Sequence, residues 1–262
     1  MGIVYAPAKT GGTLLERLIR PVLRARRDFF LHKPDYYLNR AKDASGEKAA
    51  LQLGPDMSGS YRSNANPGVA KKAEKTVYWA NKATRLIEEI MIGKNSQELI
   101  PLSLQLFEAY TLRGDTLGKD LNDWMGAYQM HKAAQAALVG NVGSTFEMRE
   151  NIADSLYRQA YAKFALSEIF DATRHARDAA KEYESMLGER KQLGEARLLV
   201  KWGEALMLEG RACRWDRDID GAKKLISSAI EKFEGARQIS GDMDTAGKRI
   251  DDAVQELASL GA

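Results

Sequence analysis

The positions of the prolines constrain the fold of this chain more than any other feature. All six (Pro7, Pro21, Pro34, Pro55, Pro67 and Pro101) lie in the first 101 residues, so the 161 residues that follow contain none. Proline interrupts helices, and its absence over so long a stretch is typical of a helical domain. With 44% hydrophobic and 29% charged residues, the composition is that of an ordinary globular protein. We therefore expect residues 67–262 to form an all-α domain.

The first 66 residues have a different character. Gly11-Gly12, Pro34 and Gly54-Pro55 interrupt them, and residues 58–66 are mostly polar. Such a segment has too few contiguous apolar positions for a core of its own. The sequence predicts an extended arm over residues 1–66, with at most short helices near 13–30 and 35–45, and where the arm is ordered it must lie along other protein surface.

Charge is distributed unevenly along the chain. Residues 1–80 hold 14 basic and 7 acidic side chains, a net charge of +7, whereas residues 81–262 hold 25 and 29, a net charge of −4. The basic residues near the N-terminus alternate with leucine, isoleucine and valine, a pattern that resembles an organellar targeting segment. A basic arm that docks on an acidic partner is the alternative. The candidate partner-binding residues of the arm are Arg17, Arg20, Arg24, Arg26 and Arg27.

From Asn66 onward, apolar residues recur at three- and four-residue steps, as on one face of a helix. Asn66-Pro67 supplies an N-cap followed by proline at the first helical position. Ser144 and Glu147 have the spacing of a capping box. The expected helices are about 67–92, Asn95–Gly114, Leu117–Gly140, Ser144 through Phe164, Ile169–Gly188, Ala196–Gly210, Asp220 through Ala236, and a last helix that ends at Gly261. No strand pattern of comparable length is present.

Three of these helices share one arrangement of small residues. The trios are Ala127/His131/Ala134, Ala172/Ala176/Ala179 and Ala222/Ile226/Ala229, and each follows a helix with a central alanine, Ala109, Ala160 or Ala205. Small residues at these places let two helices approach closely. Together with the stretch Trp202–Gly210, the pattern resembles a tetratricopeptide-type helical array over about residues 96–238, with the final helix as a cap.

The resemblance implies antiparallel helix pairs and a broad binding surface. Tetratricopeptide units run about 34 residues with a proline near the end. The units here are longer and lack proline, so the expected array is irregular, and an irregular α-helical bundle stays open as the alternative.

Candidate chemical motifs are few and weak. Asp216, Asp218, Asp220 and Gly221 match the first half of a calcium loop, but Ser227 stands where a bidentate glutamate is needed, so an interhelical turn with an aspartate N-cap is favoured. His131 lies on an apolar stripe and is expected in the core. His175 is expected to form a surface pair with Asp171 and Asp178. The default position of the four tryptophans is the core: Trp79, Trp124, Trp202 and Trp215.

Other sites are not predicted. The sequence predicts no zinc site, because its three histidines are scattered and Cys213 is its single cysteine. Lys71-Lys72 and Lys75 are able to contact RNA phosphates, but the sequence does not show the interleaved aromatic residues of base-stacking modules. Solvated faces or acidic protein partners are therefore favoured over nucleic acid, which stays open as an alternative. No apolar run is long enough to span a membrane. We expect neither a cofactor, nor a metal, nor a catalytic site.

These observations predict a non-catalytic accessory or scaffold subunit of a large assembly, which binds neighbouring proteins through its helical array and its N-terminal arm. An intracellular setting is expected, with mitochondria favoured over the cytosol: a respiratory or ATP synthase complex, or a mitochondrial ribosome. Two alternatives remain open. One is a free tetratricopeptide-type adaptor or co-chaperone that binds peptide segments, and the other is an RNA-associated helical protein.

Overall fold

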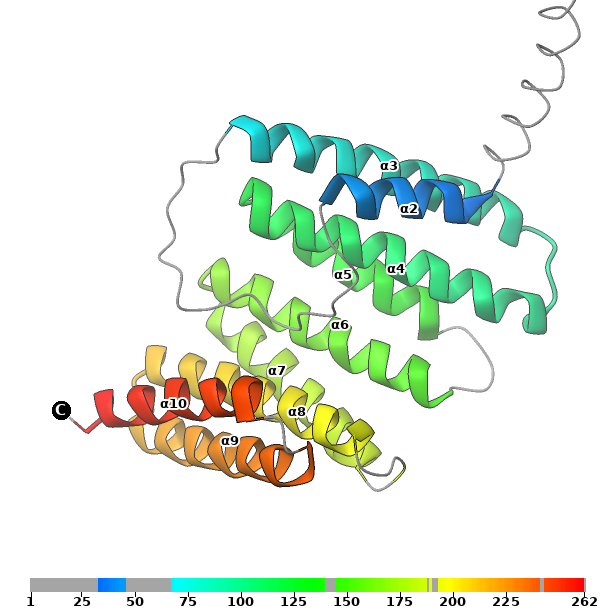
Figure 1. The fold of residues 1–262 in the computed structure, drawn as a ribbon. Helices are drawn as coiled ribbons and strands as arrows, with labels where there is room; N and C mark the ends of the chain where they lie inside the picture. Colours follow the sequence, from blue (N-terminus) through cyan, green and yellow to red (C-terminus); the bar gives the residue numbers. More distant parts are fainter. Residues whose placement is uncertain are drawn as a thin grey trace, which may run out of the picture.

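A computed structural model describes residues 33–45, 67–139, 145–187, 189, 193–240 and 243–261, and over these residues the predicted all-α fold is confirmed (Figure 1). The helices are α2 (Pro34–Ser45), α3 (Pro67–Met91), α4 (Ser96–Leu121), α5 (Trp124–Val139), α6 (Phe146–Ala165), α7 (Ile169–Met186), α8 (Leu193–Trp215), α9 (Ile219–Ser240) and α10 (Met243–Ser259).

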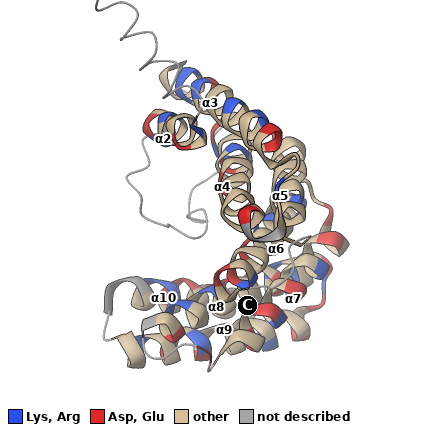
Figure 2. Cartoon of the chain, turned by 90° about the vertical axis from the view of Figure 1, so that its right-hand side faces the viewer, with Lys and Arg blue, Asp and Glu red and all other residues tan. Residues whose placement is uncertain are grey.

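The helices are arranged in two layers. Each helix packs against the next one in sequence, and α2, α4, α6 and α8 also contact one another in that order. We call α2, α4, α6, α8 and α10 the inner layer; α3, α5, α7 and α9 form the outer layer. Figure 2 shows the array curving, with α2 and α10 at its two ends on the same side. The inner layer is therefore the surface on which helices from distant parts of the sequence come together.

The second half of the array repeats one turn three times. Asn122, Ser167 and Arg217 adopt positive φ angles of 54°, 60° and 64°, and each lies five residues before the first member of a buried trio. Non-glycine residues rarely adopt this conformation. It recurs 45 and then 50 residues further along, so a turn with one left-handed residue just before the next helix joins α4 to α5, α6 to α7 and α8 to α9.

The residue after each of these turns is acidic. Asp123 and Asp218 cap the following helix, because their carboxylates accept hydrogen bonds from the amides of Gly126 and Gly221 at 2.8 and 2.9 Å. Glu168, the third, pairs with Lys163 instead. The favoured interpretation of the aspartates between α8 and α9, an interhelical turn with an aspartate N-cap, is thus confirmed.

The predicted alanine pattern forms the contact between the paired helices. All nine members of the three trios are buried, as are the central alanines Ala109, Ala160 and Ala205. Larger apolar side chains fill the space around them, among them Tyr183, Met186 and Phe233. Side chains from α6, α7, α8, α9 and α10 thereby share one continuous core.

Some predicted helix boundaries were wrong. The break expected at Gly114 is absent because α4 continues to Leu121, and α8 likewise continues through Gly210 to Trp215. Thr145, rather than Ser144, is the N-cap of α6, and its hydroxyl accepts from the Met148 amide at 3.2 Å. Asn95 and Glu98 do begin a helix, since each side chain accepts from the other's backbone amide.

The short helix expected near 35–45 is α2, which packs on α3 and α4. Leu38 and Ala41 are buried there, and Lys42 pairs with Glu108 of α4. The helix expected near 13–30 and the arginines of the arm lie outside the described residues.

Gly203 provides a test of the close packing of α8 on α9. A Cβ atom at this position would lie 2.5 Å from Cε1 of the buried Phe233 ring. We expect Gly203→Ala to lower the free energy of unfolding by about 1–2 kcal/mol, because overpacking outweighs the gain in helix propensity of about 1 kcal/mol. Urea denaturation followed by circular dichroism measures this change in the free energy of unfolding. The control is Gly247→Ala in α10, where nothing lies within 4 Å of the added methyl group; a control that destabilises equally would contradict the packing argument.

Candidate functional site: a charged cavity between α8 and α10

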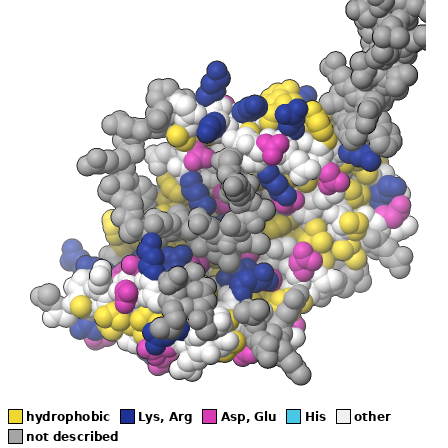
Figure 3. Space-filling view, in the orientation of Figure 1, with side chains coloured by type: hydrophobic (Ala, Val, Ile, Leu, Met, Phe, Trp, Pro, Cys, Tyr) yellow, Lys and Arg dark blue, Asp and Glu magenta, His cyan; other side chains and the backbone are white. Residues whose placement is uncertain are grey.

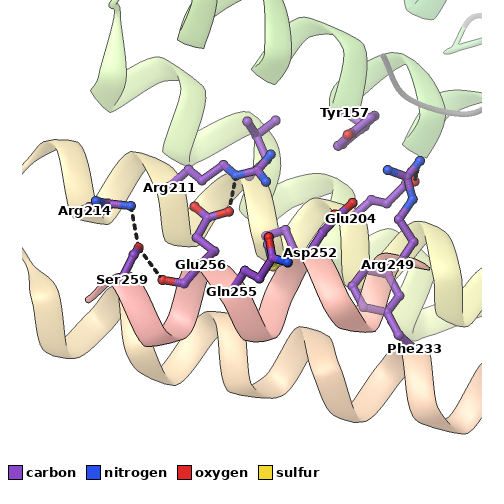
Figure 4. A pocket seen from close by; sticks show the side chains of 12 residues that line it. Tyr157, Glu204, Arg211, Arg214, Phe233, Arg249, Asp252, Gln255, Glu256 and Ser259 are labelled. Carbon is purple, nitrogen blue, oxygen red and sulfur yellow. Dashed lines mark hydrogen bonds and ion pairs between the residues drawn. The ribbon is translucent and has the colours of Figure 1, made fainter. Parts of the chain in front are cut away.

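A cavity of about 310 Å³ lies between α8 and α10 on the inner layer (Figure 4). Tyr157 of α6 and Phe233 of α9 complete its wall, so four helices contribute to it. Met207, Leu208 and Phe233 supply apolar surface, and the remaining lining is mainly charged. The combination of apolar surface with a few convergent polar groups is that of a binding site.

Three polar contacts join α8 to α10 across this cavity. Arg249 contacts the Glu204 carboxylate at 2.7 Å, and Arg211 donates to Glu256 at 2.7 Å. Arg214 donates to the Ser259 hydroxyl at 3.1 Å. These contacts fix α10 beside α8, and they hold both rows of charged side chains in place around the cavity.

The Glu204 carboxylate is almost fully buried. Burial raises its pKa to about 7, although Arg249 opposes the shift. Near neutral pH this carboxylate is therefore populated in both its protonated and its charged form. A second cation brought into the cavity would favour the charged form, so this group is poised to respond to a basic ligand.

Two other groups in the cavity lack a partner within the described part of the chain. The half-buried Asp252 carboxylate forms no ion pair there, and the hydroxyl of the buried Tyr157 forms no hydrogen bond there. Burial and the nearby Glu204 raise the pKa of Tyr157, so its hydroxyl stays protonated and is able to donate. A ligand that offers a cation and an acceptor would satisfy both groups.

A buried lysine cluster lies deeper between α6, α7 and α8. Lys201 is 2% exposed and contacts Glu150 at 2.6 Å and Asp154 at 2.8 Å. The Tyr183 hydroxyl donates to the other oxygen of Asp154 at 2.7 Å, and Arg197 pairs with Glu150. Each carboxylate therefore has at least two partners, so the cluster joins three helices and leaves little capacity for a ligand.

A second cluster surrounds His131. Its Nε2 lies 3.5 Å from Oδ1 of Asp115, and the same oxygen accepts from Arg158 at 3.2 Å. Burial lowers the pKa of His131 to about 4. The Ser155 hydroxyl is also close, but it donates to the His131 backbone carbonyl at 2.5 Å. A serine, a histidine and an aspartate thus meet here in an arrangement that does not activate the hydroxyl, because the imidazole is not its acceptor.

His175 and Trp215 lie in surroundings that differ from those predicted from the sequence. His175 pairs with neither Asp171 nor Asp178, because neither of its ring nitrogens has a hydrogen-bond partner among the described residues. Its ring packs against Tyr128 with ring centroids 6.0 Å apart, and Asp171 pairs with Arg174 at 2.9 Å. Trp215 is 65% exposed, at the end of α8, instead of lying in the core. His131 is buried, as predicted.

Other predictions concern metal and membrane binding. Among the described residues, no group of three histidine, cysteine or acidic side chains is placed to hold a metal ion. Burial raises the pKa of the Cys213 thiol, which is partly exposed. Within the described helices, none combines the length and the apolar character of a membrane span.

The cavity was not predicted from the sequence. The residues that line it lie up to 102 positions apart in the sequence, from Tyr157 in α6 to Ser259 in α10. One signal was available: Lys201 and Glu204 interrupt the apolar stripe of α8 at positions that face inward. Charged residues at core positions are retained only where partners compensate them, so they mark a place where other charged side chains converge.

Comparison with known proteins gives no family for this chain. No protein-family model matches it, and no curated protein matches it in sequence.

Proposed function

We propose that this protein is a non-catalytic accessory subunit that binds a neighbouring protein through the inner layer of a tetratricopeptide-like array. The observation that carries the proposal is the cavity between α8 and α10, in which Asp252 and Tyr157 have unused bonding capacity. A lysine or arginine side chain of the partner is the occupant that fits, because its apolar stem would contact Met207 and Leu208 while its cation pairs with Asp252. A mitochondrial assembly remains the favoured setting.

Two features support binding over catalysis at this site. The charged side chains on α8 and α10 are mostly engaged with one another, so they hold the shape of the cavity and do not present a free nucleophile. The half-buried position of Asp252 favours binding of a cation, because a charge pair formed away from solvent is stronger than one on an open surface. The cavity is therefore suited to hold one basic side chain as an anchor within a larger interface.

The first experiment is sedimentation of a gentle native extract, followed by identification of the proteins that co-migrate with this chain. A peak far above the 29.1 kDa of the monomer supports the accessory-subunit proposal and identifies the assembly. Migration of the chain alone near that mass would contradict it, and the free adaptor would then be the better hypothesis.

Asp252→Lys tests the cavity itself. The new ammonium group would occupy the position of the partner's cation, and like charges in a desolvated interface cost several kcal/mol. We expect recovery of the co-migrating partner to fall at least about ten-fold. Asp251→Lys is the matched control, because Asp251 is exposed and does not line the cavity. If both variants retain the partner equally, the cavity is not the docking site.

A further inference from the structure

The exposed face of α3 carries an aligned row of cations around one aromatic ring. Its members, here named the basic stripe, are Lys71, Lys75, Tyr78, Lys82 and Arg85, and all five are exposed. Their spacing of four, three, four and three residues confines them to an arc of about 80° and a length of about 21 Å along the helix. Figure 3 shows Lys and Arg side chains gathered along the edge of the molecule over α2 and α3.

The cations of the basic stripe form no ion pair within the described part of the chain. Lys71 and Lys75 stand four residues apart, a spacing at which like charges destabilise a helix. Elsewhere the chain uses this spacing for an opposite-charge pair, as between Lys94 and Glu98 at 3.1 Å. Glu74 flanks the stripe and Glu89 follows its end. The stripe thus keeps a net positive charge that no folding contact explains.

Tyr78 lies at the centre of the basic stripe and is 53% exposed. Its ring meets Trp79 edge-on, with centroids 5.1 Å apart and planes at 74°. Trp79 is in turn stacked on Tyr37 of α2 at 5.8 Å. The Lys82 ammonium lies 5.8 Å from the centre of the Tyr78 ring. Packing through Trp79 therefore orients an exposed aromatic ring between cations on both sides along the helix.

We propose that the basic stripe of α3 binds single-stranded nucleic acid, with phosphates along the cations and a base stacked on Tyr78. Single-strand-binding proteins combine these two elements, a cationic track and aromatic platforms for bases. An acidic protein surface fits less well. Lysine is depleted in protein–protein interfaces, and the stripe has no aliphatic anchor among its five residues. This site is independent of the cavity on the inner layer.

The test measures binding of the full-length chain to a fluorescein-labelled 15-nucleotide oligo-U by fluorescence anisotropy at several salt concentrations. Each phosphate contact adds about 0.7 to the slope of log affinity against log salt for single strands. Lys75→Ser/Lys82→Ser is expected to reduce that slope by about 1.4. The arginines of the arm are present in both the wild type and the variant. Their contribution to the slope therefore cancels when the two slopes are subtracted.

The charge-matched control is Lys181→Ser/Lys224→Ser, which removes two exposed cations from α7 and α9. It is expected to leave the slope at the wild-type value. Tyr78→Ala is expected to weaken binding about 5- to 150-fold without changing the slope, since stacking releases no counterions. Oligo-dT in the same assay separates a general single-strand site, which binds both polymers alike, from one that requires the 2′-hydroxyl of RNA.

Two results would overturn the proposal. One is a slope for the Lys75/Lys82 variant equal to that of the control. The other is tighter binding of a poly-glutamate peptide than of the oligonucleotide to the same residues, which would assign the stripe to an acidic protein. Circular dichroism of each variant checks that the helices are retained, so that lost binding is not lost folding.

Discussion

Replacing Lys201 with methionine is expected to lower the free energy of unfolding by about 3–5 kcal/mol. The ammonium group is buried and contacts both Glu150 and Asp154, at 2.6 and 2.8 Å. Methionine has a similar volume and fills the space, but it removes the cation beside Asp154 and one of the two cations beside Glu150, which keeps Arg197, in a region from which water is excluded. The loss is large because the substitution leaves the buried Asp154 charge uncompensated next to Glu150, whereas removal of the Lys201, Glu150 and Asp154 charges together is much less costly.

Urea denaturation at pH 7.5, followed by circular dichroism, measures this loss. The control is Lys181→Met, an exposed position on α7 where a change within about 0.5 kcal/mol is expected. The triple variant Lys201→Met/Glu150→Gln/Asp154→Asn is expected to recover most of the stability, since it retains the shape of the cluster without its charge. A loss below about 1 kcal/mol for Lys201→Met alone would show that the cluster is accessible to water.

The fold was predictable where the sequence pattern and the packing depend on the same residues. Helix α3 was expected over 67–92 and spans Pro67–Met91, because the proline at its start and the glycine after its end are local signals. The buried alanine trios were also visible, because small residues at helical spacing have one main use, close helix contact. These features require no knowledge of distant contacts.

The interior glycines show where local reasoning failed. The sequence predicts the end of a helix at Gly114, but this residue lies within α4. The His131 ring occupies the space beside it, since an added Cβ would lie 2.6 Å from the ring. Gly210 has the same relation to Ile226 at 2.9 Å. A glycine that ends a helix and one that accommodates a neighbour are identical in sequence, and only the tertiary contact distinguishes them.

The two proposed sites differ in how far they could be predicted. Lys71, Lys75 and Lys82 were visible as basic residues, but the orientation of the exposed Tyr78 ring depends on Trp79, which is itself stacked on Tyr37 of α2. The cavity depends on α10 folding back beside α8, a contact made across 45 residues by Arg211 and Glu256. No periodicity within one helix reports such a pairing. The resemblance of this chain to the tetratricopeptide family stays a prediction.

Acidification is expected to destabilise this protein through His131. The folded-state pKa of the buried imidazole is about 4, below the ordinary value of 6.5, because burial disfavours its charged form. The unfolded chain therefore binds a proton at this histidine from pH 6.5 downward, while the folded chain does not until about pH 4. Stability from this group is fully present above pH 6.5 and declines by about 3 kcal/mol as the pH falls to 4.

The comparison of wild type with His131→Gln isolates this effect. Glutamine keeps a polar side chain beside Asp115 but does not titrate, so the variant loses stability at neutral pH and gains on the wild type as the pH falls. The raised pKa of Glu204 acts in the opposite sense, since its contribution is present below pH 4.5 and declines toward pH 7. Both proteins contain Glu204, so its effect cancels in their difference. Unfolding free energies measured at pH 7.5, 6.0, 5.0 and 4.2 give that difference directly, and a difference that stays constant would mean that water or a rearranged Asp115 solvates the imidazole.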